Sequence, residues 1–135
     1  MNTQKVVLVD DNRSVLDALG EFLQMAAGVE CLRFQGLKQL VDREIDVLNR
    51  GVVAAILDIN LGQNQPSGID VYHWLRNHDF PGKIAFLTAH AKDHPLVVQA
   101  SLIGGVKVFT KPMDAEALVS LIQEQSIDPP EQPHA

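Results

Sequence analysis

The chain has 135 residues, one cysteine and a formal net charge of −6, from 17 acidic and 11 basic side chains. A length of this order corresponds to about one domain. The acidic balance argues against direct nucleic-acid binding, because phosphate backbones require basic surfaces. A single cysteine excludes an internal disulfide. No apolar run approaches the ~20 residues of a membrane span, so we expect no membrane contact and a cytoplasmic location.

The chain alternates five times between a short apolar run and a helical pattern. The first run is rich in β-branched residues and does not alternate with polar ones, which is typical of strands buried on both faces of a sheet. The run over residues 52–57 is the clearest buried strand of the chain. The predicted strands are residues 5–9, 29–34, 52–57, 83–87 and 106–109.

Apolar side chains recur at three- and four-residue steps between these strands, which predicts helices. The inward face of the first helix, which ends at Gly28, is predicted to carry Val15, Leu19, Phe22, Leu23 and Ala26. The inward face of the second, residues 37–48, is predicted to carry Leu37, Leu40, Val41, Ile45 and Leu48. The remaining helices are predicted at residues 68–77, 95–103 and 114–125.

This order of elements predicts one α/β domain over residues 1–125. Strands that alternate with helices form a parallel sheet covered on both faces, and right-handed crossovers leave few topologies. We expect a flavodoxin-like, doubly wound (βα)5 fold with a five-stranded sheet of order 2-1-3-4-5. Residues 126–135 include three prolines and little to bury, so we expect a disordered tail there.

Polar residues stand where the predicted strands end. Asp10 and Asp11 follow the first strand, Asp58 the third and Thr88 the fourth, and Lys111 comes just after the fifth. Taken singly, each aspartate is readily explained as a turn or helix cap. As an ordered set, the three acids should converge, and carboxylates so close repel one another unless a cation intervenes. Hard oxygen ligands suit Mg²⁺, and the set predicts a site for a phosphoryl group on or beside a carboxylate.

Four motifs resemble those of a known family. They are Val7-Leu8-Val9-Asp10-Asp11-Asn12, Ile56-Leu57-Asp58, Leu87-Thr88-Ala89-His90 and Val108-Phe109-Thr110-Lys111-Pro112-Met113. Over about residues 4–125 the chain resembles the receiver domain of two-component response regulators, of the CheY-like superfamily. The resemblance implies that Asp58 accepts a phosphoryl group from a sensor histidine kinase or a phosphotransfer protein.

The resemblance also implies the roles of the residues around Asp58. Asp10, Asp11, Asp58 and the backbone carbonyl of Asn60 would hold Mg²⁺, and Lys111 would pair with the phosphoryl oxygens.

Further residues would make up the switch. Thr88 would move to hydrogen-bond the phosphoryl group, and Phe109 would swing from exposed to buried on activation. Asn60 and His90 match positions that tune the lifetime of the phosphoryl group.

An output protein or a second copy would bind the face formed by residues 95–103, 106–109 and 114–125. The helix predicted over residues 95–103 is unusually apolar, which fits such a surface. The alternative is a set of single exposed apolar residues, which are common on protein surfaces.

One departure from the family pattern lies in the loop over residues 60–67. The family places a glycine eight residues after the phosphoacceptor, whereas Gly68 comes ten residues after Asp58, and Gly62 stands where proline is common. The loop is therefore about two residues longer, which leaves its conformation and kinase docking open.

Three alternatives accompany this interpretation. The chain could be the receiver part of a larger multidomain regulator or hybrid kinase. It could be an aspartyl-phosphate hydrolase, but that reaction normally uses an acid two residues after the nucleophile, and Asn60 cannot donate a proton in that way. It could be a phosphorylation-independent interaction module, against which the intact acids and Lys111 argue. We expect the chain to have no enzymatic activity other than its own phosphotransfer and autodephosphorylation.

Overall fold

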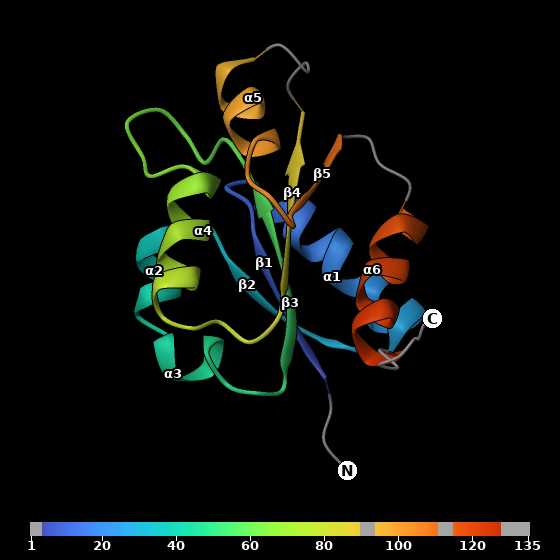
Figure 1. The fold of residues 1–135 in the computed structure, drawn as a ribbon. Helices are drawn as coiled ribbons and strands as arrows, with labels where there is room; N and C mark the ends of the chain where they lie inside the picture. The colour runs from blue at the N-terminus through green and yellow to red at the C-terminus, as the bar shows by residue number, and fades with distance from the viewer. Residues whose placement is uncertain (1–3, 90–93, 111–114, 128–135) are drawn as a thin grey trace.

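A computed structural model describes residues 4–89, 94–110 and 115–127 of the chain. Its centre is a five-stranded parallel sheet in the order β2-β1-β3-β4-β5, which confirms the predicted topology (Figure 1). The strands are β1 (Lys5–Val9), β2 (Glu30–Phe34), β3 (Val52–Asp58), β4 (Lys83–Thr88) and β5 (Lys107–Thr110).

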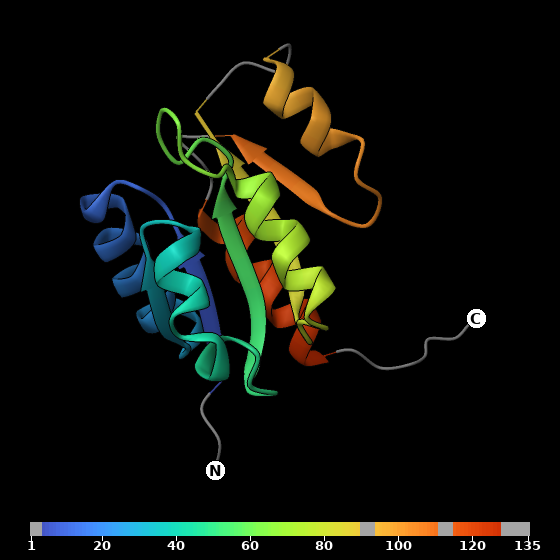
Figure 2. The same cartoon turned by 90° about the vertical axis from the view of Figure 1, so that its left-hand side faces the viewer.

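Helices cover both faces of the sheet, as predicted. The helices are α1 (Arg13–Ala27), α2 (Leu37–Val41), α3 (Glu44–Val47), α4 (Gly68–Asn77), α5 (Pro95–Ser101) and α6 (Ala115–Ile127). Residues of α1 and α6 pack against one face, and residues of α2 to α5 pack against the other. Figure 2 shows α5 beside β5, at the carboxyl end of the sheet.

Two apolar clusters lie on the two faces, because successive strand side chains point in opposite directions. Along β1, Val7 and Val9 face the cluster beneath α2 to α5, whereas Val6 and Leu8 face the cluster beneath α1 and α6. All four are at most 1% exposed. The uninterrupted apolar runs therefore reflect burial on both sides.

The prediction of one continuous helix over residues 37–48 is wrong. It is broken into α2 and α3, because the Arg43 N–H donates to the Leu40 carbonyl three residues back instead of continuing the four-residue ladder. This tighter turn rotates the chain that follows. Val47 is consequently buried, and Ile45, which was expected inside, is 88% exposed.

The inward face of α1 also differs from the prediction. Its buried residues are Leu16, Gly20 and Leu23, while Phe22 is 36% exposed and Ala26 is exposed. Gly20 lies on this buried face, and a count of apolar side chains overlooks it. A β-carbon there would lie 2.6 Å from the guanidinium of Arg33, which crosses the helix at this point.

The ends of the helices follow from their capping residues. The Asn12 Oδ1 accepts hydrogen bonds from the N–H groups of Ser14 at 2.9 Å and Val15 at 3.3 Å, and Gly28 ends α1 with φ 68°. Helix α6 extends to Ile127, two residues beyond the predicted boundary. The rest of the predicted tail lies outside the described residues. Within the described ranges, no helix is both long and apolar enough for a membrane span.

Candidate functional site

The register of the sheet brings the predicted acids together. Val9 pairs with Leu57, so Asp10 and Asp58 follow at the same level on neighbouring strands. The Asp10 N–H donates to the Phe34 carbonyl at 3.0 Å, which holds the end of β1 against β2. Carboxylate oxygens of Asp10, Asp11 and Asp58 all lie within 4.8 Å of one another. The predicted convergence of the three acids is therefore confirmed.

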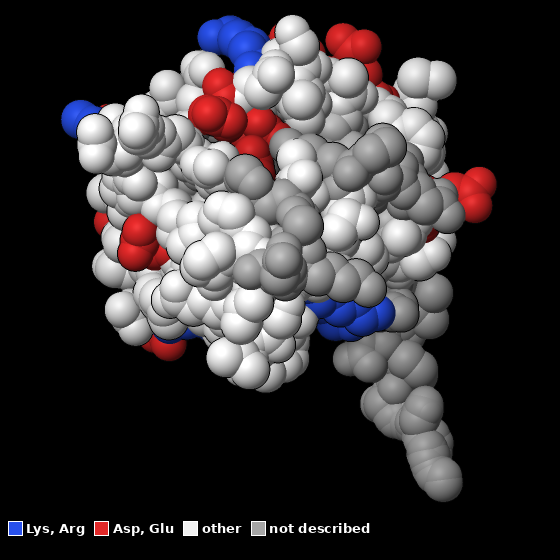
Figure 3. All heavy atoms as spheres, turned by 90° about the horizontal axis from the view of Figure 1, so that it is seen from above, with Lys and Arg blue, Asp and Glu red and all other residues white. Residues whose placement is uncertain are grey.

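The surroundings of the three carboxylates differ. Asp10 is 4% exposed and Asp58 is 8% exposed, whereas Asp11 is exposed. Figure 3 looks down on this edge of the sheet and shows acidic side chains gathered there. Two unit charges about 5 Å apart repel each other by roughly 1 to 3 kcal/mol, depending on the effective dielectric constant. A divalent cation offsets this repulsion, and clustered carboxylate oxygens are the ligands that Mg²⁺ prefers, so the residues present fit that ion.

In the loop after β3, a glycine lies close to the acidic cluster. Gly62 has φ 118°, and a β-carbon there would lie 3.9 Å from a carboxylate oxygen of Asp11. The Gly62 N–H donates to the side-chain Oδ1 of Asn60 at 3.0 Å, so this side chain helps to form the turn. The proposed role of the Asn60 backbone carbonyl as a metal ligand stays a prediction.

The two extra residues of the loop are accommodated before α4 begins. Asn64 has φ 62°, and the Gln65 N–H donates to the Gly62 carbonyl at 3.3 Å. Gly68 then donates its N–H to the Ile59 carbonyl at 2.7 Å. The start of α4 is therefore fixed against the strand that carries Asp58 despite the longer loop.

The two predicted switch residues lie on neighbouring strands. Thr88 is fully buried and pairs with Thr110, and Leu87 pairs with Phe109. Phe109 is partly buried and packs against the cluster beneath α1 and α6, and the switch roles of both residues stay predictions.

Two other predicted site residues follow β4 and β5 in the sequence. Lys111 and His90 lie outside the described residues, and their roles stay predictions.

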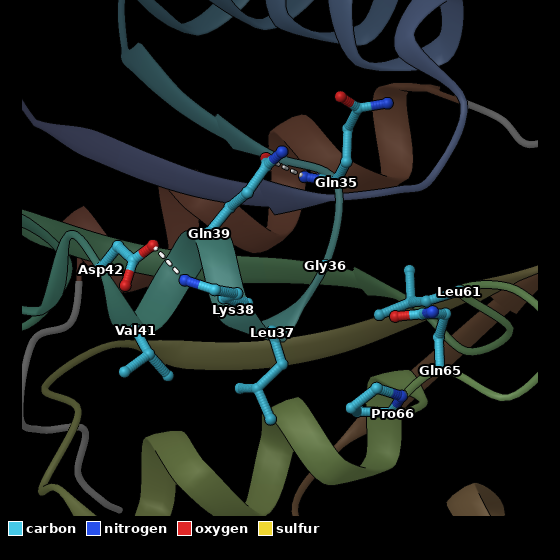
Figure 4. Close-up of a pocket in the computed structure, with 10 residues that line it drawn as sticks. All are labelled: Gln35, Gly36, Leu37, Lys38, Gln39, Val41, Asp42, Leu61, Gln65 and Pro66. Carbon is cyan, nitrogen blue, oxygen red and sulfur yellow. Dashed lines mark hydrogen bonds and ion pairs between the residues drawn. The ribbon is translucent and has the colours of Figure 1, made fainter.

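One residue of this region escaped the sequence analysis. Gln35 follows β2 directly, and its side-chain Nε2 donates to the Asp11 carbonyl at 3.2 Å. Its own N–H donates to the Oε1 of Gln39 at 2.8 Å (Figure 4). These residues line a cavity of about 680 Å³ between α2 and the loop that contains Leu61 and Pro66. Its position in the sequence could have indicated a role at the site, because Gln35 is the polar residue at the end of the second strand.

Comparison with known proteins identifies the family. The family described as the response regulator receiver domain matches residues 6–123. Response regulator protein TodT of Pseudomonas putida is 30% identical over 119 residues, which are 87% of this chain and 49% of TodT. Response regulator protein TmoT of Ectopseudomonas mendocina is 30% identical over 125 residues, which are 91% of this chain and 54% of TmoT. The chain thus spans about half the length of these curated relatives.

Solved structures show the same fold. The response regulator StyR is 26% identical, with a TM-score of 0.72 over 92% of this chain and 59% of that one. A response regulator receiver protein from Pseudoalteromonas atlantica has a TM-score of 0.76 at 19% identity, over 92% of this chain and 98% of that one. Together with the acidic cluster at the carboxyl edge of the sheet, these matches show that the chain belongs to the response regulator receiver domains of two-component signalling.

Proposed function

We propose that Asp58 accepts a phosphoryl group from the phosphohistidine of a sensor kinase or a phosphotransfer protein. The observation that carries this proposal is the cluster of three carboxylates, in which Asp58 is buried. A carboxylate oxygen of Asp58 attacks phosphorus, the phosphorus–nitrogen bond breaks, and the donor imidazole leaves. The reaction depends mainly on positioning and charge neutralisation, so a fixed carboxylate beside a cation site is suited to it.

The backbone around Asp58 supplies the positioning. Asp58 pairs with Leu87 of β4, and the preceding Leu57 pairs with Val9 of β1, so the nucleophile is fixed from both sides. Asp10, Asp11 and Asp58 would hold Mg²⁺, together with the Asn60 carbonyl. The ion would neutralise the negative charge that the phosphoryl group brings to the three acids, and Lys111 would add a second positive charge.

In this proposal, phosphorylation shifts the domain between two states. The phosphoryl group brings a charge near −2, and the Thr88 hydroxyl hydrogen-bonds it in the active state. Phe109 then moves further into the cluster that it already contacts. The population shifts only as far as the two states differ in their interactions with the phosphoryl group.

The surface that reads out this switch is the α5–β5–α6 face. On α5, Val98 is 45% exposed and Leu102, which caps the helix, is 81% exposed, which supports a partner-binding role. We propose that this face binds an output protein or a second copy of the domain, in the cytoplasm. Catalysis by the domain is limited to its own phosphotransfer and dephosphorylation.

The test is the intact mass of the protein after incubation with a small phosphodonor and Mg²⁺. We expect the wild type to gain one phosphoryl group, and to gain none when a chelator is present. Asp58→Asn should gain none. The matched control is Asp79→Asn, the same chemical change at the opposite edge of the sheet, at a position with φ 59° that asparagine tolerates. This control should behave as the wild type.

Other outcomes would contradict the proposal. A phosphoryl group that persists in Asp58→Asn assigns the acceptor to another residue. No gain from either a small donor or a phosphohistidine donor favours the phosphorylation-independent interaction module. Steady release of phosphate from an excess of a phosphate ester favours the hydrolase.

A further inference from the structure

A second polar site lies at the opposite edge of the sheet, where the strands begin. We propose that it binds a small anion that carries a phosphate group. The site is a cavity of about 240 Å³ lined by Arg76, Pro81, Gly82, Lys83, Ile84, Gly105, Lys107 and Leu121. Three of these residues are cationic, in a chain whose net charge is −6, and none of the lining residues that the structure describes is acidic.

The cavity exists because β4 begins earlier than β5. The pairing of these strands starts at Ala85 and Lys107, so Lys83 and Ile84 border a notch instead of a strand. Gly82 forms part of its wall, and a β-carbon there would lie 2.5 Å from the Val53 carbonyl carbon. Glycine therefore lets the wall of the notch pack directly against β3.

Two cations at this notch, Arg76 and Lys107, differ in their pairing from three other basic side chains of the chain. Arg33, Lys38 and Arg43 are each bound to an aspartate. Arg76 and Lys107 form no ion pair with any acidic residue that the structure describes. The Arg76 guanidinium lies 5.7 Å from the centre of the Tyr72 ring, a cation–π contact that orients the group and leaves its N–H donors available.

The chemistry and size of the cavity select the ligand class. A guanidinium presents a planar fork of donors that matches phosphate oxygens, and lysine adds a point charge. Arg76 and Lys107 together balance a phosphate dianion, whereas a singly charged carboxylate would balance only one of them. The volume of about 240 Å³ lies below the roughly 300 to 1,000 Å³ of pockets for drug-sized ligands. The site therefore fits inorganic phosphate or a small phosphate monoester.

The bound anion would connect the proposed output face to α4. Lys107 begins β5 and Leu121 belongs to α6, while Arg76 lies near the end of α4. An anion held by Arg76 and Lys107 would tie α4 to β5 at the base of that face. This inference is independent of the proposed phosphorylation, because the cavity is at the far edge of the sheet from Asp58.

The test is an amide NMR titration of the full chain carrying Asp58→Asn, without Mg²⁺ and at fixed ionic strength. The probes are inorganic phosphate, glycerol phosphate and acetate. We expect both phosphates to shift the amide signals of Gly82, Gly105 and Lys107 in a saturable manner, and acetate to bind more weakly. If glycerol phosphate binds more tightly than inorganic phosphate, the ligand is a phosphorylated metabolite. If the two bind equally well, the ligand is inorganic phosphate.

Variants connect this binding to the named cations. Arg76→Gln and Lys107→Gln should each weaken binding roughly fivefold or more, because each removes a charge-assisted hydrogen bond. Lys38→Gln, the same change at an exposed lysine on α2, should leave the affinity unchanged. The inference is overturned if the shifts do not saturate, if both cavity variants bind phosphate as the parent does, or if acetate binds more tightly than phosphate.

Discussion

Gly68 lies directly against the backbone of Asp58. A β-carbon at position 68 would lie 2.9 Å from the Asp58 carbonyl carbon and nearer still to its oxygen. The Gly68 N–H also donates to the Ile59 carbonyl at 2.7 Å. The start of α4 is thus fixed to β3 by contact with its backbone, and this contact does not depend on the length of the loop between them.

This contact predicts that Gly68→Ala is harmful even though alanine is small. The added methyl group meets backbone atoms that cannot rotate away, so α4 must shift. We expect a loss of about 1 to 3 kcal/mol in the free energy of unfolding and slower phosphorylation of Asp58. Urea denaturation and intact-mass time courses measure the two effects.

Gly104→Ala is the matched control for this change. A β-carbon at Gly104 has no neighbour within 4 Å, so the free energy of unfolding should change by at most about 0.5 kcal/mol. Equal effects of the two substitutions would show that the close approach of Gly68 to Asp58 is not required.

The acidic cluster predicts opposite effects of Asp11→Asn with and without Mg²⁺. Without a divalent cation, the substitution removes one charge from a mutually repelling set, and we expect the free energy of unfolding to rise by roughly 0.5 to 1 kcal/mol. Added Mg²⁺ should stabilise the wild type, because it binds only the folded state, and should stabilise the variant much less.

Urea denaturation in chelator and in Mg²⁺ measures both effects. Asp79→Asn serves as the control and should keep the wild-type response to Mg²⁺. The interpretation fails if Asp11→Asn is destabilising in chelator and the wild type does not respond to the ion.

The hydrogen bond from Gln35 to the Asp11 carbonyl predicts a role in positioning that acid. Gln35→Ala should weaken Mg²⁺ binding roughly twofold to tenfold, since one hydrogen bond of modest net strength is lost. The measurement is the Mg²⁺ dependence of the unfolding midpoint. Gln99→Ala, an exposed site on α5, is the control. A Mg²⁺ affinity that is unchanged in Gln35→Ala would mean that the contact does not position Asp11.

The sequence predicted the sheet and the acidic site because both depend on local pattern. Residues 6–9 of β1 and 52–57 of β3 are uninterrupted apolar runs, and the acid that follows each run lies at the carboxyl edge of the sheet. The break between α2 and α3 was missed because Ile45 and Val47 are both apolar, and only packing against the sheet determines which one is buried. Gln35 and Gly20 were missed because contacts between distant elements leave no periodic signal.

Cys31 is the single cysteine of the chain. Its thiol is partly buried and donates to the Gly20 carbonyl at 3.8 Å. Desolvation by burial raises the pKa of this thiol from 9.0 to about 11, a shift that Arg33 opposes and Glu30 supports. Because the thiolate is the reactive form, we expect a thiol reagent at pH 8 to react much more slowly with the folded protein than with the chain in urea.

The raised pKa of Cys31 also determines the sign of a pH effect on stability. From pH 9 to about 11 the folded state keeps a proton that the unfolded state releases, so the free energy of unfolding falls as pH rises. The difference in this free energy between the wild type and Cys31→Ala should therefore be constant below pH 9 and shift against the wild type between pH 9 and about 11. Equal reaction rates of the folded and unfolded protein, or a difference that does not change with pH, would show that burial does not perturb this thiol.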